Sequence, residues 1–240
     1  MQLQNNKILI TGGASGIGFG LTKRFIEENN TVIIFGRRED VLEEVREQLP
    51  AVITRVCDLS IEEQRIDLYK WIEDEHSDLN VLINNAGIQN WMNISDNDFY
   101  EKANNEITIN AMAPVHLTNL FLNLQSLKTI ANVTSGLAFV PLSKVPVYCA
   151  TKAFMRSFTL SLRYLLKPNI EVIEIIPPAL NTDLGGKGIH TAYPPVSDFI
   201  ESIFKQLKEG KTELTFGTSE DRAQANNETI LAYFNRMNPS

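Results

Sequence analysis

The chain has 240 residues, of which 43% are hydrophobic and 21% are charged, and its formal net charge is −7. This composition excludes a fibrous or disordered architecture, and the length suits a single α/β domain over residues 1–240. The acidic charge, with no clustered Lys/Arg face in the sequence, argues against nucleic acid or an anionic membrane as a partner.

Cysteine and histidine are sparse. Cys57 and Cys149 are too few for a disulfide framework or a cysteine-rich zinc site. His76, His116 and His190 are widely separated, so we expect no metal site. The first strand pattern begins by residue 7, and we find neither a signal-peptide pattern nor a membrane-length apolar run. A cytoplasmic location is therefore expected.

The first element is a short apolar run, residues 7–10, which leads into a glycine-rich turn over residues 11–18 and then a helical pattern over residues 21–28. A strand–turn–helix unit of this kind brings backbone N–H groups and the positive end of a helix dipole close to an anionic ligand. The glycines Gly12, Gly16 and Gly18 give the spacing G-x-x-x-G-x-G rather than G-x-G-x-x-G. On its own, this spacing is compatible with either a pyrophosphate site or a turn that only ends a strand.

A second apolar strand pattern, residues 31–35, ends at Gly36-Arg37-Arg38. At this place an acidic side chain binds the adenosine ribose of NAD, whereas Arg accommodates the 2′-phosphate of NADP. Viewed alone, the two arginines are solvated charges. If the glycine turn binds a dinucleotide, they favour NADP(H), with NAD(H) still possible.

Strand and helix patterns then alternate along the chain. Alternation of this kind predicts a doubly wound parallel sheet of about seven strands, with helices on both faces and ligands beyond the carboxyl ends of the strands. The further expected strands are residues 51–57, 81–83, 129–133, 171–176 and 213–216. The expected helices are residues 39–48, one beginning near residue 61, residues 101–125, one that follows Tyr148, residues 196–209 and residues 228–236.

Several polar side chains follow the ends of these strands. Asp58 could accept a hydrogen bond from an adenine amino group or help to cap the next helix. Asn85 could hold a turn, while Ala86 and Gly87 leave room for a flat ring. Pro114 predicts a bend in the helix over residues 101–125. Asn110 precedes that bend, where its amide could bond a freed carbonyl or a water.

Tyr148 and Lys152 are four residues apart in a helical pattern, which places both side chains on one face. Alone, this spacing is compatible with an ordinary exposed pair. Ser135 follows the strand at residues 129–133.

Taken together, these motifs resemble the short-chain dehydrogenase/reductase family in its compact single-domain branch. The matching residues, in the family's order, are Thr11-Gly12-x-x-x-Gly16-Ile17-Gly18, Asn84-Asn85-Ala86-Gly87, Asn110, Ser135 and Tyr148-x-x-x-Lys152. Residues 81–90 and 234–239 are most similar to the DltE-like oxidoreductase subgroup. The resemblance implies a Rossmann-like fold, hydride transfer between NADP(H) and a small-molecule carbonyl or secondary alcohol, and a homodimer or homotetramer.

The resemblance also implies a role for each motif residue. Tyr148 is expected to give or take the proton, and Lys152 to hold the nicotinamide ribose. Because a nearby cation favours the phenolate, we also expect Lys152 to lower the pKa of Tyr148. Ser135 would hydrogen-bond the substrate oxygen and Asn110 would position a water. The implied cofactor contacts are Gly12, Ser15, Gly16, Ile17, Gly18, Arg37, Arg38, Asp58, Asn85, Tyr148, Lys152, Pro177 and Thr182.

A different class of function is a non-catalytic NADP(H)-sensing regulatory protein on the same fold. The joint presence of Ser135, Tyr148 and Lys152 argues against it, because a sensor does not need all three.

The region after the sixth strand is expected to govern substrate choice. Many members of the family have Pro-Gly-x-x-x-Thr here, whereas this chain has Pro178 in place of the glycine, which predicts a stiffer loop. Residues 183–195 are rich in Gly and Pro and predict a mobile substrate lid. We expect a mainly apolar pocket, with no charged residue placed for a carboxylate or phosphate. Its expected lining is Trp91, Phe139, Leu180 and Tyr193.

Overall fold

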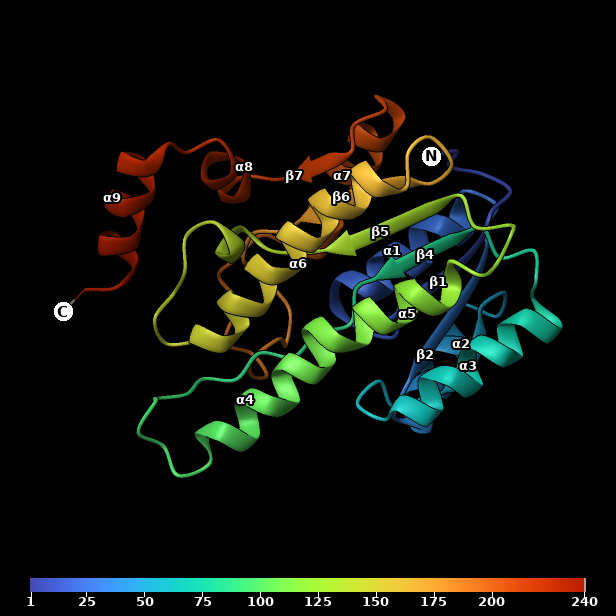
Figure 1. The fold of residues 1–240 in the computed structure, drawn as a ribbon, viewed down its shortest axis with the longest axis horizontal. Coiled ribbons are helices and arrows are strands. Elements are labelled where there is room, and N and C mark those ends of the chain that lie inside the picture. Colours follow the sequence, from blue (N-terminus) through green and yellow to red (C-terminus); the bar gives the residue numbers. More distant parts are fainter. Residues whose placement is uncertain (240) are drawn as a thin grey trace.

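The structure is a computed structural model in which residues 1–239 are described. Within this range seven strands form one parallel sheet in the order β3-β2-β1-β4-β5-β6-β7 (Figure 1), which confirms the predicted doubly wound α/β fold. The strands are β1 Lys7–Thr11, β2 Thr31–Gly36, β3 Ile53–Val56, β4 Val81–Asn84, β5 Thr129–Val133, β6 Glu171–Ile176 and β7 Glu213–Thr215. The helices are α1 Gly16–Glu27, α2 Glu39–Gln48, α3 Glu62–Glu75, α4 Phe99–Ile107, α5 Ala113–Phe121, α6 Pro146–Leu165, α7 Val196–Lys208, α8 Thr218–Ala223 and α9 Asn227–Met237.

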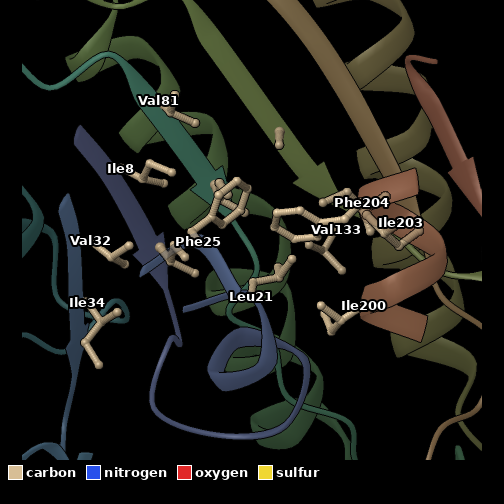
Figure 2. Close-up of a cluster of buried hydrophobic side chains, with 14 of the residues drawn as sticks. Ile8, Leu21, Phe25, Val32, Ile34, Val81, Val133, Ile200, Ile203 and Phe204 are labelled. Atoms are coloured by element: carbon tan, nitrogen blue, oxygen red, sulfur yellow. The ribbon is translucent and has the colours of Figure 1, made fainter. Parts of the chain in front are cut away.

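The strands are buried on both faces, which explains their nearly continuous apolar sequences. In β1, Ile8 and Ile10 join a cluster with side chains from α1 and α7, whereas Leu9 joins a second cluster with side chains from α3 and α5. Figure 2 shows the first cluster, in which the rings of Phe25 and Phe204 lie with their centroids 4.7 Å apart. The alternation of side chains along each strand therefore provides a core on either side of the sheet.

The strand order reverses at β1. From β1 the chain adds β2 and then β3 on one side, and it then returns to place β4 against the other side of β1. In doubly wound sheets, ligands bind at such a reversal, beyond the carboxyl ends of the strands.

The long helix predicted over residues 101–125 differs from expectation. It consists of α4, a π-helical turn over Thr108–Met112, and α5, which ends at Phe121. Pro114 lies in the first turn of α5, and the Ala113 N–H bonds the Thr108 carbonyl five residues back. The π turn lies just before Pro114 and shifts the hydrogen-bond register at the place where proline has no N–H to give.

The C-terminal part contains one helix that the sequence pattern did not predict, α8, followed by the expected α9. Figure 1 shows α9 set apart from the sheet, beyond α8. The segment over residues 177–195 forms neither helix nor strand. It is nonetheless anchored, because Asn181 N donates to Pro194 O at 2.9 Å and Trp91 Nε1 donates to Gly185 O at 3.1 Å. No helix in the described residues is long and apolar enough to cross a membrane.

A buried polar network links the middle of the sheet to α6. The Asn84 amide donates to Asn132 Oδ1 at 2.9 Å, and the Asn132 amide donates to Thr159 Oγ1 at 2.9 Å. Asn132 and Thr159 are fully buried. Buried polar groups that lose a partner cost about 1–3 kcal/mol each.

We expect Asn132→Leu to reduce the free energy of unfolding by about 2–4 kcal/mol, because the substitution leaves the Asn84 amide and the Thr159 hydroxyl without this partner. Urea unfolding at constant m-value measures the change. Asn104→Leu, at an exposed helical position, is the control. An Asn132→Leu protein as stable as the wild type would contradict the role given to the network.

Candidate active site

A set of hydrogen bonds joins the carboxyl ends of β1 and β4. The Thr11 hydroxyl accepts from the backbone N–H groups of Asn85 and Ala86 at 2.8 and 2.7 Å. The Asn85 side-chain amide donates to the carbonyls of Thr11 and Gly12 at 2.9 and 3.3 Å. Asn85 therefore holds the turn, which is one of the roles that its position in the sequence allowed.

The glycine turn fits a dinucleotide phosphate group. Gly12 and Gly16 have φ values of +63° and +51°, and a Cβ on Gly18 would overlap the Gly12 carbonyl oxygen. Ser15 stands at the N-cap of α1 without a side-chain cap bond, and no acidic residue lies in the first turn of that helix. The backbone N–H groups at this helix end are thus placed to bind an anion.

The other residues expected at the cofactor come from separate elements. Thr182 lies against the glycine turn, since a Cβ on Gly16 would be 3.5 Å from Thr182 Cγ2. Pro177 is buried, and its carbonyl accepts from Gly136 N at 3.0 Å. Arg37 and Arg38 are exposed after β2 and form no ion pair with any residue in 1–239.

Asp58 does not cap α3. Its Oδ1 accepts from Ser60 N at 2.8 Å and from Ser60 Oγ at 2.7 Å, and the N-cap position belongs to Ile61. The carboxylate therefore closes a local turn, because Ser60 is near enough to satisfy it before the helix begins. Its contact with adenine stays a prediction.

Tyr148, Lys152 and Ser135 lie together beyond β5. The two α6 side chains are each only 5% exposed, so they do not form an ordinary exposed pair. Lys152 Nζ lies 5.6 Å from the centroid of the Tyr148 ring and donates to the Val133 carbonyl at 2.8 Å. The hydroxyl of Ser135 accepts from Leu137 N at 3.1 Å, which leaves its own proton available to an acceptor.

Asn110 lies in the π turn and reaches out of its own helix. Its Oδ1 accepts from Ile88 N, and its amide donates to Ile88 O, both at 2.8 Å. The amide also contacts Thr151 Oγ1 at 3.3 Å. The expectation that Asn110 bonds a freed carbonyl of its own helix is therefore wrong, because the wide turn presents the side chain to the segment after β4. A Cβ on Gly87 would lie 3.3 Å from Asn110 Oδ1 and 3.6 Å from Lys152 Nζ, so these two groups share one site.

Burial dominates the electrostatics of this site. It raises the pKa of Tyr148, the charge of Glu106 adds to the increase, and a hydrogen bond with Ser135 opposes it. Burial also lowers the pKa of Lys152 to about 8. The expectation that Lys152 lowers the pKa of Tyr148 is therefore not met in the protein alone: the loss of hydration disfavours the phenolate and the ammonium alike.

Glu106 is a member of this site that the sequence reasoning missed. The residue is fully buried in α4, and Oε2 accepts from Asn90 Nδ2 at 3.0 Å, while Oε1 has no partner in the described residues. Burial raises the pKa of Glu106, and the positive charge of Lys152 opposes the increase. The only signal in the sequence is that Glu106 precedes Asn110 by four residues, on the same helix face.

The remaining residues of the described range provide no metal centre. No group of three or more His, Cys, Asp or Glu side chains within residues 1–239 could hold a metal ion. The polar groups at the ends of β1, β4 and β5 thus make up the candidate site.

Comparison with known proteins gives consistent results. A family model described as short chain dehydrogenase matches residues 6–191. The uncharacterized oxidoreductase DltE of Bacillus subtilis (strain 168) is 42% identical to this chain, over 99% of this chain and 98% of DltE. Both findings agree with the resemblance drawn from the motifs.

Solved structures share the fold. A short chain dehydrogenase from Burkholderia cenocepacia J2315 in complex with NADP has a TM-score of 0.83 and 24% identity, with 99% of both chains covered. A short chain dehydrogenase/reductase from Burkholderia phymatum in complex with NAD has a TM-score of 0.81 and 16% identity, with 98% of this chain and 93% of that chain covered.

The buried ammonium leads to a prediction for the pH dependence of stability. The pKa of Lys152 is about 8 in the folded protein and about 10.5 when unfolded. Between these values the unfolded chain binds the extra proton, so the wild type gains stability as the pH rises. We expect the wild type to gain roughly 2 kcal/mol relative to Lys152→Met between pH 7 and pH 10, as measured by urea unfolding.

Lys205→Met, which replaces an exposed lysine of α7, is the matched control and should show no such pH-dependent difference. A stability difference between the wild type and Lys152→Met that is constant from pH 7 to pH 10 would contradict the buried, destabilised ammonium.

Proposed function

The chain belongs to the short chain dehydrogenase family of oxidoreductases, and on that premise we propose that it transfers a hydride between NADP(H) and a carbonyl compound or the corresponding secondary alcohol. The observation that carries this proposal is the buried pair of Tyr148 and Lys152 beside Ser135, at the carboxyl end of β5. Buried titratable groups clustered at a strand end are typical of a catalytic site.

Each of these side chains has a distinct task in the proposed reaction. The nicotinamide supplies the hydride to the carbonyl carbon. Tyr148 gives its phenolic proton to the carbonyl oxygen, and the Ser135 hydroxyl donates a hydrogen bond to the same oxygen as negative charge develops. Lys152 holds the nicotinamide ribose. Asn110 holds the backbone at Ile88 through two hydrogen bonds. In the proposal it also positions a water near Lys152.

The raised pKa of Tyr148 keeps this side chain in its protonated form but also makes it a weaker acid. A phenol in this environment keeps its proton near neutral pH, and the protonated form is the one that reduction uses. In the oxidative direction Tyr148 must act as a base, and the positive charge of the oxidised nicotinamide is of the sign that favours the phenolate.

We assign the cofactor contacts by their places around the site. Gly12, Ser15, Gly16, Ile17 and Gly18 surround the pyrophosphate, with Asp58 on the adenine side and Asn85, Pro177 and Thr182 on the nicotinamide side. Arg37 and Arg38 bind the 2′-phosphate, and their exposure without an ion-pair partner among residues 1–239 supports this assignment.

Residues 183–195 act in this proposal as the substrate lid. Within the expected lining, Trp91 bonds the segment directly and Tyr193 belongs to it. Phe139 instead packs against Arg156, whose Cζ lies 4.2 Å from its ring centroid. Leu180 is 3% exposed within the cluster that packs on α1 and α7, so it contributes to the core.

The proposed assembly is a homodimer or homotetramer formed through α4, α5 and α6. Exposed apolar side chains on these helices support it, among them Ile107 of α4 and Phe154 and Leu165 of α6, which are 44%, 47% and 71% exposed.

Tyr148→Phe should lower kcat at least a hundredfold, in line with the roughly 10²–10⁴-fold value of a positioned general acid, and should leave NADPH binding unchanged. Nicotinamide absorbance with a panel of aldehydes and ketones measures turnover, and a fluorescence titration measures binding. Tyr164→Phe, which is exposed on the same helix, is the control. Turnover retained in Tyr148→Phe would refute the proton-transfer role, and wild-type protein that binds NADPH but reduces no member of the panel would favour the sensor.

Arg37→Asp should weaken NADPH binding roughly tenfold to a hundredfold, because a charge-assisted contact with the 2′-phosphate is lost, and should change NADH binding much less. Titration of both cofactors into the variant tests this. Arg46→Asp, at an exposed position on α2, controls for the change in net charge. An unchanged ratio of the two affinities would refute the phosphate assignment.

A further inference from the structure

The short helix α8 is fixed to the end of the sheet beside the catalytic serine. Ser219 is fully buried, and its hydroxyl donates to the Ile176 carbonyl at 2.6 Å. Arg222 lies one turn later, against Gly136: a Cβ on Gly136 would be 3.4 Å from both Cδ and Nη1 of Arg222. Gly136 directly follows Ser135, so the Arg222 guanidinium lies against the residue next to the one proposed to bind the substrate oxygen.

Among residues 1–239, Arg222 has no partner for its charge. No carboxylate of residues 1–239 lies within 4.0 Å of its guanidinium, and the side chain donates no hydrogen bond to them, whereas Arg156 and Arg163 pair with Glu174 and Glu213 at 2.6 and 3.0 Å. The residue is only partly exposed, and burial lowers the pKa of Arg222. Guanidinium groups withdrawn from water normally bind an acceptor.

A second arginine lies near the first. Arg236 of α9 stacks over the Tyr233 ring, with Cζ 5.1 Å from the ring centroid, and its charge also lowers the pKa of Arg222. Tyr193 of the proposed lid and Cys149, which is next to Tyr148, lie close enough to affect the same guanidinium. Arg222 thus has a second arginine, a residue of the proposed lid and the neighbour of Tyr148 close to it, in a chain whose net charge is −7. An anion between the two arginines would remove their repulsion and occupy their N–H donors.

We propose that Arg222, assisted by Arg236, binds a carboxylate or phosphate group that the substrate carries at the end remote from its reacting carbon. The substrate class is then a short oxo acid or hydroxy acid, or a phosphate equivalent. Adjacent Cα atoms are about 3.8 Å apart, so the closeness of Arg222 to Ser135 places the anion only a few bonds from the carbonyl. This inference rests on the proposed oxidoreductase function, and it differs from the expectation of a pocket without a charged residue.

The first test compares matched substrates in the full-length protein with NADPH. Oxo carboxylic acids of increasing chain length are paired with their methyl esters, which keep the shape and lose the charge. The wild type should prefer the acids in kcat/KM by roughly tenfold to a hundredfold, mainly through KM. Arg222→Gln should abolish the preference, and Arg222→Lys, which retains the charge but not the two-pronged geometry, should keep part of it.

Turnover of phosphate-bearing aldehydes is measured separately, and it distinguishes a site for phosphate from a site for carboxylate. Arg46→Gln, on α2, should leave the ratio of acid to ester unchanged. Equal turnover of acids and esters by the wild type, or a preference that survives in Arg222→Gln, would overturn the inference while leaving the oxidoreductase function standing.

A binding measurement keeps the two proposals separable if no carbonyl compound is turned over. With NADP⁺ present, succinate or inorganic phosphate should raise the melting temperature of the wild type above that in chloride of equal ionic strength, and should not do so for Arg222→Gln. Failure of all turnover together with this stabilisation would refute the oxidoreductase function and keep the anion site. The absence of any anion-specific stabilisation would refute the anion site itself.

Discussion

The hydrogen bonds between Thr11 and the Asn85–Ala86 segment are the constraint on which the rest of the site depends. They join β1 to β4 at the point where the strand order reverses. They also fix the carbonyl of Gly12, which lies so close to Gly18 that a Cβ there would overlap it. From Ala86 the chain continues to Ile88, where Asn110 binds the backbone from a different helix. Through the contact of Asn110 with Thr151, the same constraint reaches α6, which carries Tyr148, the proposed proton donor. The hydrogen bonds between these two strands thus help to position both the glycine turn and the side chains of α6 in the candidate site.

The site buries three titratable side chains, and their burial lowers the stability of the folded protein. Tyr148, Lys152 and Glu106 are each almost fully buried, and burial disfavours the charged form of every one. The opposite charges of Glu106 and Lys152 compensate each other in part, while Tyr148 is left in its neutral form. Clusters of apolar side chains on the two faces of the sheet stabilise the fold enough to tolerate this strain. Functional sites commonly hold such locally unfavourable arrangements.

The elements that the sequence predicts well are those whose signal is local. Strand periodicity, the glycine spacing and the four-residue step from Tyr148 to Lys152 all lie within short windows, and the sheet follows from the alternation of strands and helices. The direction of the Tyr148 pKa shift depends on tertiary packing, so the local pattern gave the wrong expectation for it. The part of Leu180 in a substrate pocket stays a prediction. Glu106 and Arg222 are inconspicuous in the sequence, since an acidic or basic side chain on a helix is usually solvated. The helix that holds Arg222 spans only Thr218–Ala223, too short for periodicity to predict.

The π-helical turn at Thr108–Met112 makes helix length itself a determinant of the site. Such a turn accommodates one more residue than an α-helical turn, and each residue of an α-helix advances the side chains by about 100°. Leu117 and Phe121 of α5 are locked in the core and cannot follow a rotation. A chain shortened by one residue within 108–112 would therefore turn α4 about its axis and carry Glu106 away from Lys152 and Asn90. A single deletion in this turn would thus change the charge balance of the site, and it would also displace the buried side chain of Ala103 on α4.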